Sequence, residues 1–120
     1  MNIEFEATIV DYSDAIGGDI VQVLFAEDEN EDEDLFNPTN RYLCFSSNYE
    51  LDAYIPQAEW FDGNEVDGGV NVVSYKIGHN KATIQLENGY IFHIHYQQQK
   101  VSTLSQIRSY LARECCEIDT

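Results

Sequence analysis

The chain has 120 residues, with 22 Asp and Glu against 6 Lys and Arg, which gives a formal net charge of -16. An anionic surface of this size repels phosphate, so the composition disfavours binding to nucleic acids and to anionic membranes and favours a basic partner. The length is that of one domain and the content of hydrophobic residues, 43%, suffices for a core, so we predict a single domain over residues 1–120.

The first 26 residues predict two strands. Residues 2–11 alternate apolar and polar side chains, and this period of two is typical of a half-buried strand. Residues 20–26 are more uniformly apolar and predict a second strand. The segment between them contains Gly17-Gly18 and predicts a turn, so we expect an N-terminal hairpin.

A strongly acidic run follows. Seven of the eight residues from 27 to 34 are carboxylates, and their mutual repulsion predicts a solvated acidic loop over residues 27–39, closed by Pro38. Such a loop can steer a basic partner toward the protein, and it can equally be a solvated connection without a partner. The steering candidates are Glu27, Asp28, Glu29, Glu31, Asp32, Glu33 and Asp34.

The centre of the chain predicts two more strands. Residues 41–46 form one, and residues 53–61 form an extended segment that contains Pro56. Because proline cannot donate a hydrogen bond to a neighbouring strand, we expect an edge strand or a strand start there, on which another chain could dock. Aromatic side chains dominate binding hot spots and also fill cores, and the anchor candidates on this segment are Tyr54, Trp60 and Phe61.

Residues 68–97 predict a three-stranded antiparallel meander. Three strand-like runs are separated by residues 78–80 and by Asn88-Gly89, and Asn-Gly between two strands is the strongest short signal for a hairpin.

An amphipathic helix is predicted after the meander. Ser102 or Thr103 is the expected N-cap, and apolar residues recur behind it at helical spacing: Leu104, Ile107, Leu111 and Cys115. The fold class that follows is α+β, a mostly antiparallel sheet of about six to seven strands with one C-terminal amphipathic helix packed on it.

Two histidines raise the question of a metal site. His93 and His95 share one face of a predicted strand, the spacing at which strands present paired metal ligands. A zinc site needs a third ligand, for which His79 and Glu87 are the nearby nominees. Two half-exposed histidines on the polar face of a sheet also explain the pattern, and we predict no metal and no cofactor. No Ser-His-Asp, Cys-His or nucleotide-binding pattern can be assembled, so we predict that the protein is not an enzyme.

The cysteines and the first residues of the chain indicate the cellular compartment of the protein. Cys44, Cys115 and Cys116 lack the spacing of a metal site or a disulfide framework. The opening residues lack the basic start and apolar run of a signal peptide, and no segment has the length of a membrane span. We therefore expect a cytoplasmic protein.

Several segments together resemble the immunity protein 10 family of bacterial polymorphic toxin systems. They are the strand in Asn40–Ser47 with its Arg-Tyr-Leu, the stretch Tyr54–Phe61, the turn Gly68-Gly69-Val, the strand 81–87 and the C-terminal helix, so the resemblance covers Asn40–Cys116. It implies a cytoplasmic protein that binds and neutralises a cognate toxin, often a nuclease or another enzyme acting inside the cell. The family supplies no catalytic residues to transfer.

The resemblance and the charge agree on a basic toxin as the partner. A toxin that attacks nucleic acid needs a basic surface to hold phosphate, and an acidic protein can compete for that surface while its charge accelerates the encounter. Two alternatives stay open. One is a small structural or adaptor domain, which could form a weak homo-oligomer, and the other is a metal-binding domain that uses His93 and His95.

Overall fold

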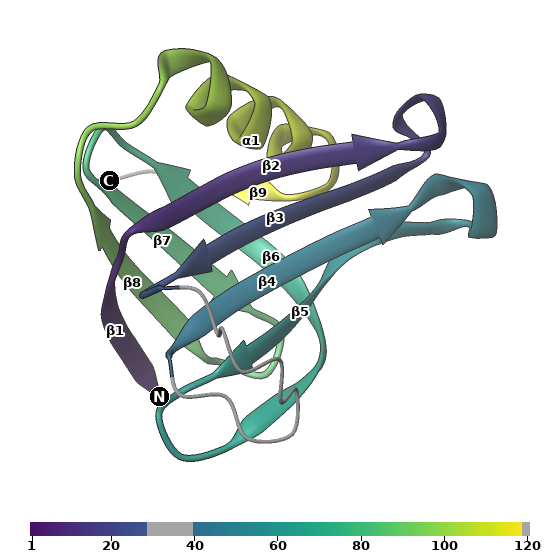
Figure 1. Cartoon of the computed structure of the whole chain (residues 1–120). Coiled ribbons are helices and arrows are strands. Elements are labelled where there is room, and N and C mark those ends of the chain that lie inside the picture. Colours follow the sequence, from purple (N-terminus) through teal and green to yellow (C-terminus); the bar gives the residue numbers. More distant parts are fainter. Residues whose placement is uncertain (29–39, 119–120) are drawn as a thin grey trace.

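The structure, a computed structural model, describes residues 1–28 and 40–118. In these residues nine strands form one sheet, accompanied by one α-helix and two short 3-10 helices (Figure 1). The α+β class and the C-terminal helix are confirmed, with more strands than predicted. No helix in the described ranges has both the length and the apolar character that crossing a membrane requires. The elements are β1 Asn2–Ala7, β2 Ile9–Ala15, η1 Ile16–Gly18, β3 Ile20–Ala26, β4 Tyr42–Asn48, η2 Tyr49–Leu51, β5 Ala53–Phe61, β6 Val66–Ile77, β7 Lys81–Leu86, β8 Ile91–Tyr96, α1 Val101–Glu114 and β9 Cys116–Glu117.

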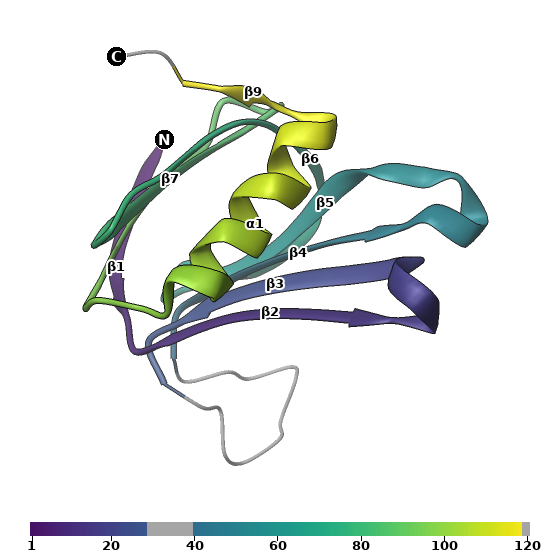
Figure 2. The ribbon, with the colours of Figure 1, turned by 90° about the horizontal axis from the view of Figure 1, so that it is seen from above.

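The sheet curls so that its two edge strands are consecutive in the chain. Its strand order is β1-β8-β7-β6-β5-β4-β3-β2, and along this order only β1 and β8 are parallel. β1 and β2 meet at Thr8, whose N–H donates to the carbonyl oxygen of Ala26 at 2.9 Å and so ties the corner to β3. The sheet thus bends around α1, with β1 and β7 on one side of the helix and β2 and β3 on the other (Figure 2).

The longest strand, β6, connects the two halves of the curled sheet. Up to Asn71 it pairs with β5, and from Val72 onward it pairs with β7. Where β5 has diverged, the short strand β9 pairs with β6 in parallel. A bulge opposite β5 helps the strand to bend, and its extra residue is Gly69, whose φ of +78° is unfavourable for other residues.

The core fills the concave side of the sheet, beneath α1. Alternate side chains of the strands point inward, as the period-two pattern of β7 and β8 predicts, and the helix adds four buried side chains. Among the largest fully buried side chains are Phe25, Phe45, Trp60, Phe92 and Tyr110. Burial of this apolar surface is the main source of stability, at about 25 cal/mol per Å².

The N-terminal prediction is partly wrong. Residues 2–11 belong to two strands, because the chain turns at Thr8 and crosses from one half of the sheet to the other. β1 pairs with β8 in parallel, and only β2 forms the expected hairpin with β3. The alternation of apolar residues continues through the corner, so it could not reveal the bend.

The prediction of an edge strand or a strand start at residues 53–61 holds only for the part of β5 before Gln57, which contains Pro56. β5 pairs with β4 on one side and, from Gln57 onward, with β6 on the other. Pro56 lies in an irregular stretch of the β4–β5 pairing, just before Gln57, and a proline is tolerated at such a bulge because no ladder hydrogen bond is needed from it.

The meander and the helix are confirmed, with a shift at the helix start. β6, β7 and β8 are consecutive antiparallel neighbours. The helix begins at Val101 rather than after Ser102 or Thr103, and its N-cap residue Lys100 makes no side-chain capping hydrogen bond. It ends at Glu114, and the next residue is extended and leads into β9.

Candidate partner-binding surface

Charge is divided between two parts of the chain. Residues 1–67 hold 18 of the 22 Asp and Glu residues but only one of the six Lys and Arg residues. Residues 68–113 hold the other five cations and a single carboxylate, Glu87. The first part builds β1–β5 and the second builds most of β6, β7, β8 and α1. The negative charge is therefore concentrated in the first part of the chain rather than spread along it.

A groove of about 780 Å³ lies on the outer face of β2, β3, β4 and β5. Three carboxylates line it, those of Asp11, Asp28 and Glu59, and Leu24 contributes apolar surface. No Lys or Arg of the described residues contributes to its lining. We call this feature the acidic groove.

Strand pairing explains how the acidic groove arises. Asp11 of β2 lies opposite Leu24 of β3, which lies opposite Cys44 of β4. Cys44 in turn lies opposite Glu59 of β5. Neighbouring strands are about 4.8 Å apart, so this row crosses about 15 Å of surface. A carboxylate stands at each end of the row, with less polar side chains between them.

Hydrogen bonds fix the neutral side chains of the groove. The hydroxyl of Tyr42 donates to Glu59 Oε1 at 3.1 Å. Burial is the largest cause that raises the pKa of Tyr42 to about 12, and the negative charge of Glu59 is the second. Gln22 Nε2 donates to Cys44 Sγ at 3.1 Å, and burial raises the pKa of the Cys44 thiol. Both groups keep their protons at neutral pH, so the carboxylates set the charge of the groove.

Glu27 has a structural role, and its assignment as a steering residue stays a prediction. Arg41 Nη2 donates to Glu27 Oε2 at 2.9 Å, and the backbone N–H of Arg41 donates to Glu27 Oε1 at 2.7 Å. The side-chain hydrogen bond from Arg41 is the main reason why the pKa of Glu27 lies below its usual value. Thr8 Oγ1 also donates to the Glu27 carbonyl oxygen at 2.6 Å. The charge of Glu27 is thus compensated where the chain leaves β3.

The rest of the acidic run is only partly described. Asp28 is exposed and lines the acidic groove, and its role toward a partner stays a prediction. The other five candidates lie outside the described residues: Glu29, Glu31, Asp32, Glu33 and Asp34.

Of the three aromatic anchor candidates, the structure exposes one. Tyr54 is 45% exposed, whereas Trp60 is 1% and Phe61 is 9% exposed. Trp60 packs against the rings of Tyr90 and Phe92 with centroid distances of 5.4 and 5.7 Å. Burial removes Trp60 and Phe61 from any surface that a partner could reach, so their assignment as anchors is corrected to core residues.

Tyr54 belongs to an exposed tip beyond β4. Its ring stacks on Tyr49, and its hydroxyl donates to Asp52 Oδ1 at 2.7 Å. Leu51 and Ile55 are exposed beside it. This tip follows the end of β4, whereas Glu27 bonds to Arg41 just before its start, about 20 Å away along the seven-residue strand. The fold therefore does not bring Tyr54 and Glu27 together.

The two histidines of the metal hypothesis face outward from β8, as predicted. His95 Nε2 lies 3.1 Å from Glu4 Oε2, and His93 Nε2 lies 3.2 Å from Asn2 Oδ1. The hydrogen bond with His95 is the first cause of a lowered pKa at Glu4. Within residues 1–28 and 40–118, no group of three or more His, Cys, Asp or Glu side chains is placed to hold a metal ion.

The sequence did not single out the residues that line the acidic groove, apart from Asp28. Alternation could place Asp11 and Glu59 on an outer face, but only the strand register joins them across the groove. The arrangement can accept hydrogen bonds from cationic side chains and contact their apolar stems. Comparisons of this chain with protein-family models, with curated proteins and with solved structures find no match.

Proposed function

We propose that this protein binds a basic protein partner in the acidic groove and, as the resemblance to immunity proteins implies, neutralises a toxin of that charge. The observation that carries the proposal is the row from Asp11 to Glu59, in which carboxylates flank Leu24. Lys and Arg side chains combine a cationic end with an apolar stem, so a basic segment laid along the row meets complementary groups throughout.

The composition of the groove supports recognition of a protein segment. Its volume of about 780 Å³ has room for several side chains. The carboxylate of Glu59 is held in place by Tyr42, and a preorganised acceptor binds a guanidinium group with less loss of side-chain entropy. Arg in particular can contact a carboxylate through two parallel hydrogen bonds.

The uneven charge distribution supports a fast and oriented encounter. A basic surface is attracted to the part of the fold made by residues 1–67 and repelled by the part that carries five of the six cations. Steering of this kind raises association rates by about 10- to 1,000-fold and weakens with added salt. A toxin that acts on nucleic acid has a cationic surface for phosphate, so it fits this distribution.

The experiment begins with capture of a partner. The immobilised protein is exposed to lysate of its source organism and washed at about 0.05 M and about 0.5 M salt, and retained proteins are identified by mass spectrometry. The captured basic protein is purified, and its affinity is measured for wild type and two double variants. Asp11→Asn/Glu59→Gln removes two charges from the groove, whereas Glu50→Gln/Glu65→Gln removes two exposed charges outside it.

We expect the groove variant to bind at least about tenfold more weakly and the matched control less than about threefold more weakly. Equal losses would mean that only net charge matters and would refute the groove as the contact. Neutralisation is tested separately. The captured protein should arrest growth when expressed alone in bacteria, and co-expression of this chain should restore growth. A harmless partner would refute the toxin assignment while leaving the binding site intact.

A further inference from the structure

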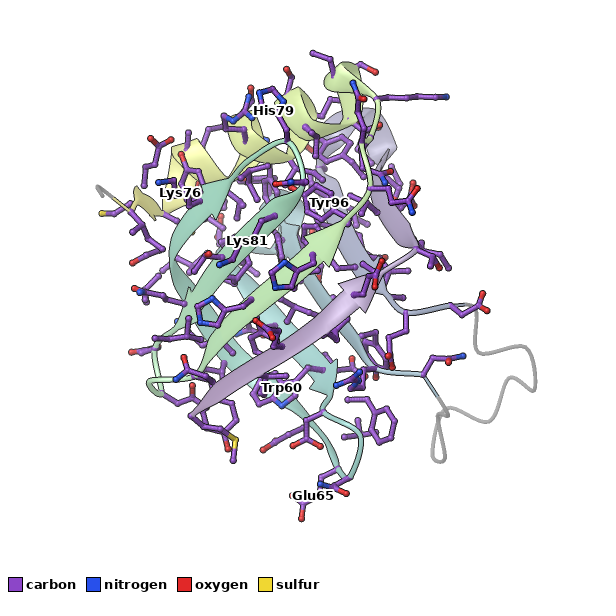
Figure 3. All side chains as sticks on the ribbon, turned by 90° about the vertical axis from the view of Figure 1, so that its left-hand side faces the viewer. Trp60, Glu65, Lys76, His79, Lys81 and Tyr96 are labelled. Atoms are coloured by element: carbon purple, nitrogen blue, oxygen red, sulfur yellow. The ribbon has the colours of Figure 1, made fainter. Side chains whose placement is uncertain are left out.

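We infer that the outer face of β6, β7 and β8 holds a binding site for a small organic carboxylate. The inference does not depend on the proposed function, because it concerns the other half of the curled sheet. A hollow of about 500 Å³ lies there, lined among others by Lys76, Lys81 and His93. Figure 3 faces this side of the molecule and shows Lys76 and Lys81 on it. We call this feature the cationic hollow.

Strand register gathers the polar side chains of the cationic hollow. Lys76 of β6 lies opposite Thr83 of β7, which lies opposite His93 of β8. This row spans about 10 Å, the size of a small ligand. Lys81 precedes Thr83 by two residues and so projects from the same face of β7. The hydrogen bond between His93 Nε2 and Asn2 Oδ1 orients the imidazole ring from the neighbouring strand β1.

The charge of the cationic hollow is unusual for this protein. Although the chain carries a net charge of -16, two of its six Lys and Arg residues line this one hollow. In the described part of the chain, no Asp or Glu contributes to the lining. Ammonium groups next to hydroxyl and amide groups, here Thr83 and Gln85, are the chemistry that recognises a carboxylate.

Apolar surface indicates that the ligand is more than a bare anion. Ile91, which lies opposite Gln85, lines the hollow, and Ile118 lines it near the point where the chain leaves β9. A volume of about 500 Å³ also exceeds what a small inorganic ion needs and lies in the usual range for organic ligands. The ligand class is therefore a carboxylate with a short apolar or aromatic body, whose head group lies near Lys81 and whose body contacts the isoleucines.

The test is a titration of the full-length protein with hexanoate, followed by amide chemical shifts in NMR spectra. Hexanamide, which has the same body without the charge, is the matched probe. We expect saturable shifts at Thr83, Gln85 and His93 with a Kd of about 1 mM for hexanoate, and much smaller shifts with hexanamide. Equal shifts with both probes, or shifts that stay linear to about 50 mM, would overturn the site.

Variants separate recognition from general charge. Lys81→Gln should weaken hexanoate binding about tenfold, and Lys81→Arg should retain it within about threefold. Lys100→Gln removes the same charge from an exposed residue outside the hollow and should change the Kd less than about twofold. If Lys100→Gln weakens binding as much as Lys81→Gln, the effect is long-range attraction and the inference fails.

Discussion

The acidic groove and the cationic hollow are built in the same way and carry opposite charge. Both lie on outer faces of one curled sheet, and in both a row of side chains crosses adjacent strands at matching register. The row on β2–β5 has Asp11 and Glu59 at its ends, whereas the row on β6–β8 runs from Lys76 to His93. Both rows lie on antiparallel strands, so the opposite charge of the two faces comes from their side chains.

Net charge is therefore a poor description of this molecule. A value of -16 suggests a uniform anionic surface that repels every anion. Most carboxylates and most cations lie in different stretches of the chain, and the acidic groove on β2–β5 is lined by three carboxylates whereas the cationic hollow on β6–β8 is lined by two lysines. The result is a strongly asymmetric field, which can orient one partner and still leave room for a small anion on the other face.

Helix α1 makes the two faces parts of one structure. Ser47 Oγ donates to the Tyr54 carbonyl oxygen at 2.7 Å, so the hydroxyl of Tyr110 must be the donor in its 2.5 Å hydrogen bond to Ser47 Oγ. On the other side, Arg108 Nη2 donates to the carbonyl oxygen of Ile77 at 3.1 Å. The helix is thus bonded to β4 in one half and to β6 in the other.

The largest predicted effect tests whether the two faces share one core. Tyr110 is fully buried, so Tyr110→Ala should leave a cavity and destabilise the protein by about 4 kcal/mol in urea unfolding. Hydrogen exchange should accelerate on β2 and β4 and also on β6 and β9, since the helix packs on β2, β6 and β9 and Tyr110 contacts Phe45 of β4.

Tyr110→Phe is the control for this prediction. It keeps the ring and removes only the hydrogen bond to Ser47, and we expect a loss of about 1 kcal/mol. Faster exchange in only one half after Tyr110→Ala would contradict the shared core and would mean that the two faces belong to units that unfold separately.

A smaller effect is expected from the ion pair at the base of the acidic run. Arg41→Met keeps the apolar stem and removes the hydrogen bonds to Glu27 Oε2 and to the Glu4 carbonyl oxygen. Because Arg41 is 38% exposed, solvent screens the pair, and we expect a loss of about 1 kcal/mol in the free energy of unfolding at pH 7. Lys100→Met, which removes an equal charge from an exposed site, should cost less than about half as much.

The pH dependence of this variant has a definite sign. The folded-state pKa of Glu27 lies below its ordinary value of 4.5, so the pair stabilises the protein above that pH. Its contribution is lost as the pH falls through the depressed pKa and Glu27 becomes protonated. The difference between wild type and Arg41→Met should therefore shrink below pH 4.5. A difference that stays constant down to about pH 2 would assign the effect to packing rather than to charge.

The sequence predicted local features well because they depend on neighbouring residues. The alternation in β7 and β8 correctly placed Ile84 and Phe92 inside and His93 outside, and helical spacing identified the buried face of α1. Trp60 shows the limit of this reasoning. An aromatic residue on a strand serves a core and an interface equally well, and only the partners of β5 decide which.

Long-range pairing is what the sequence could not predict. The parallel contact of β1 with β8 joins segments about 90 residues apart in the chain, and it determines that Glu4 and Asn2 reach the two histidines. The row of the acidic groove likewise depends on the register of four strands. Nothing in residues 2–11 or in the spacing of the carboxylates encodes these neighbours, so the candidate site emerged only from the fold.

The smallest predicted effect concerns the thiol of Cys44. Because this thiol is neutral, its reactivity reports the electrostatic potential in the acidic groove. Burial is the main cause of the raised pKa of Cys44, and the negative charge of Glu59 raises that pKa further. Glu59→Gln removes this charge but keeps an acceptor for the Tyr42 hydroxyl. The pKa of Cys44 should fall modestly, and its alkylation by neutral iodoacetamide at about pH 8 should accelerate about threefold.

Cys116 provides the comparison within the same molecule, because it is exposed on β9 and pairs with β6 on the other half of the sheet. Peptide mass spectrometry of the same samples gives the alkylation rate of Cys116. This rate should exceed the alkylation rate of Cys44 and stay unchanged in Glu59→Gln. Glu50→Gln, which also removes one carboxylate but lies outside the groove, should alter neither thiol. Acceleration of Cys44 by Glu50→Gln would show that the whole acidic surface sets the potential there. A change confined to Glu59→Gln would assign that potential to the groove, because a charge a few ångströms away is screened far less than one beyond the Debye length of about 10 Å.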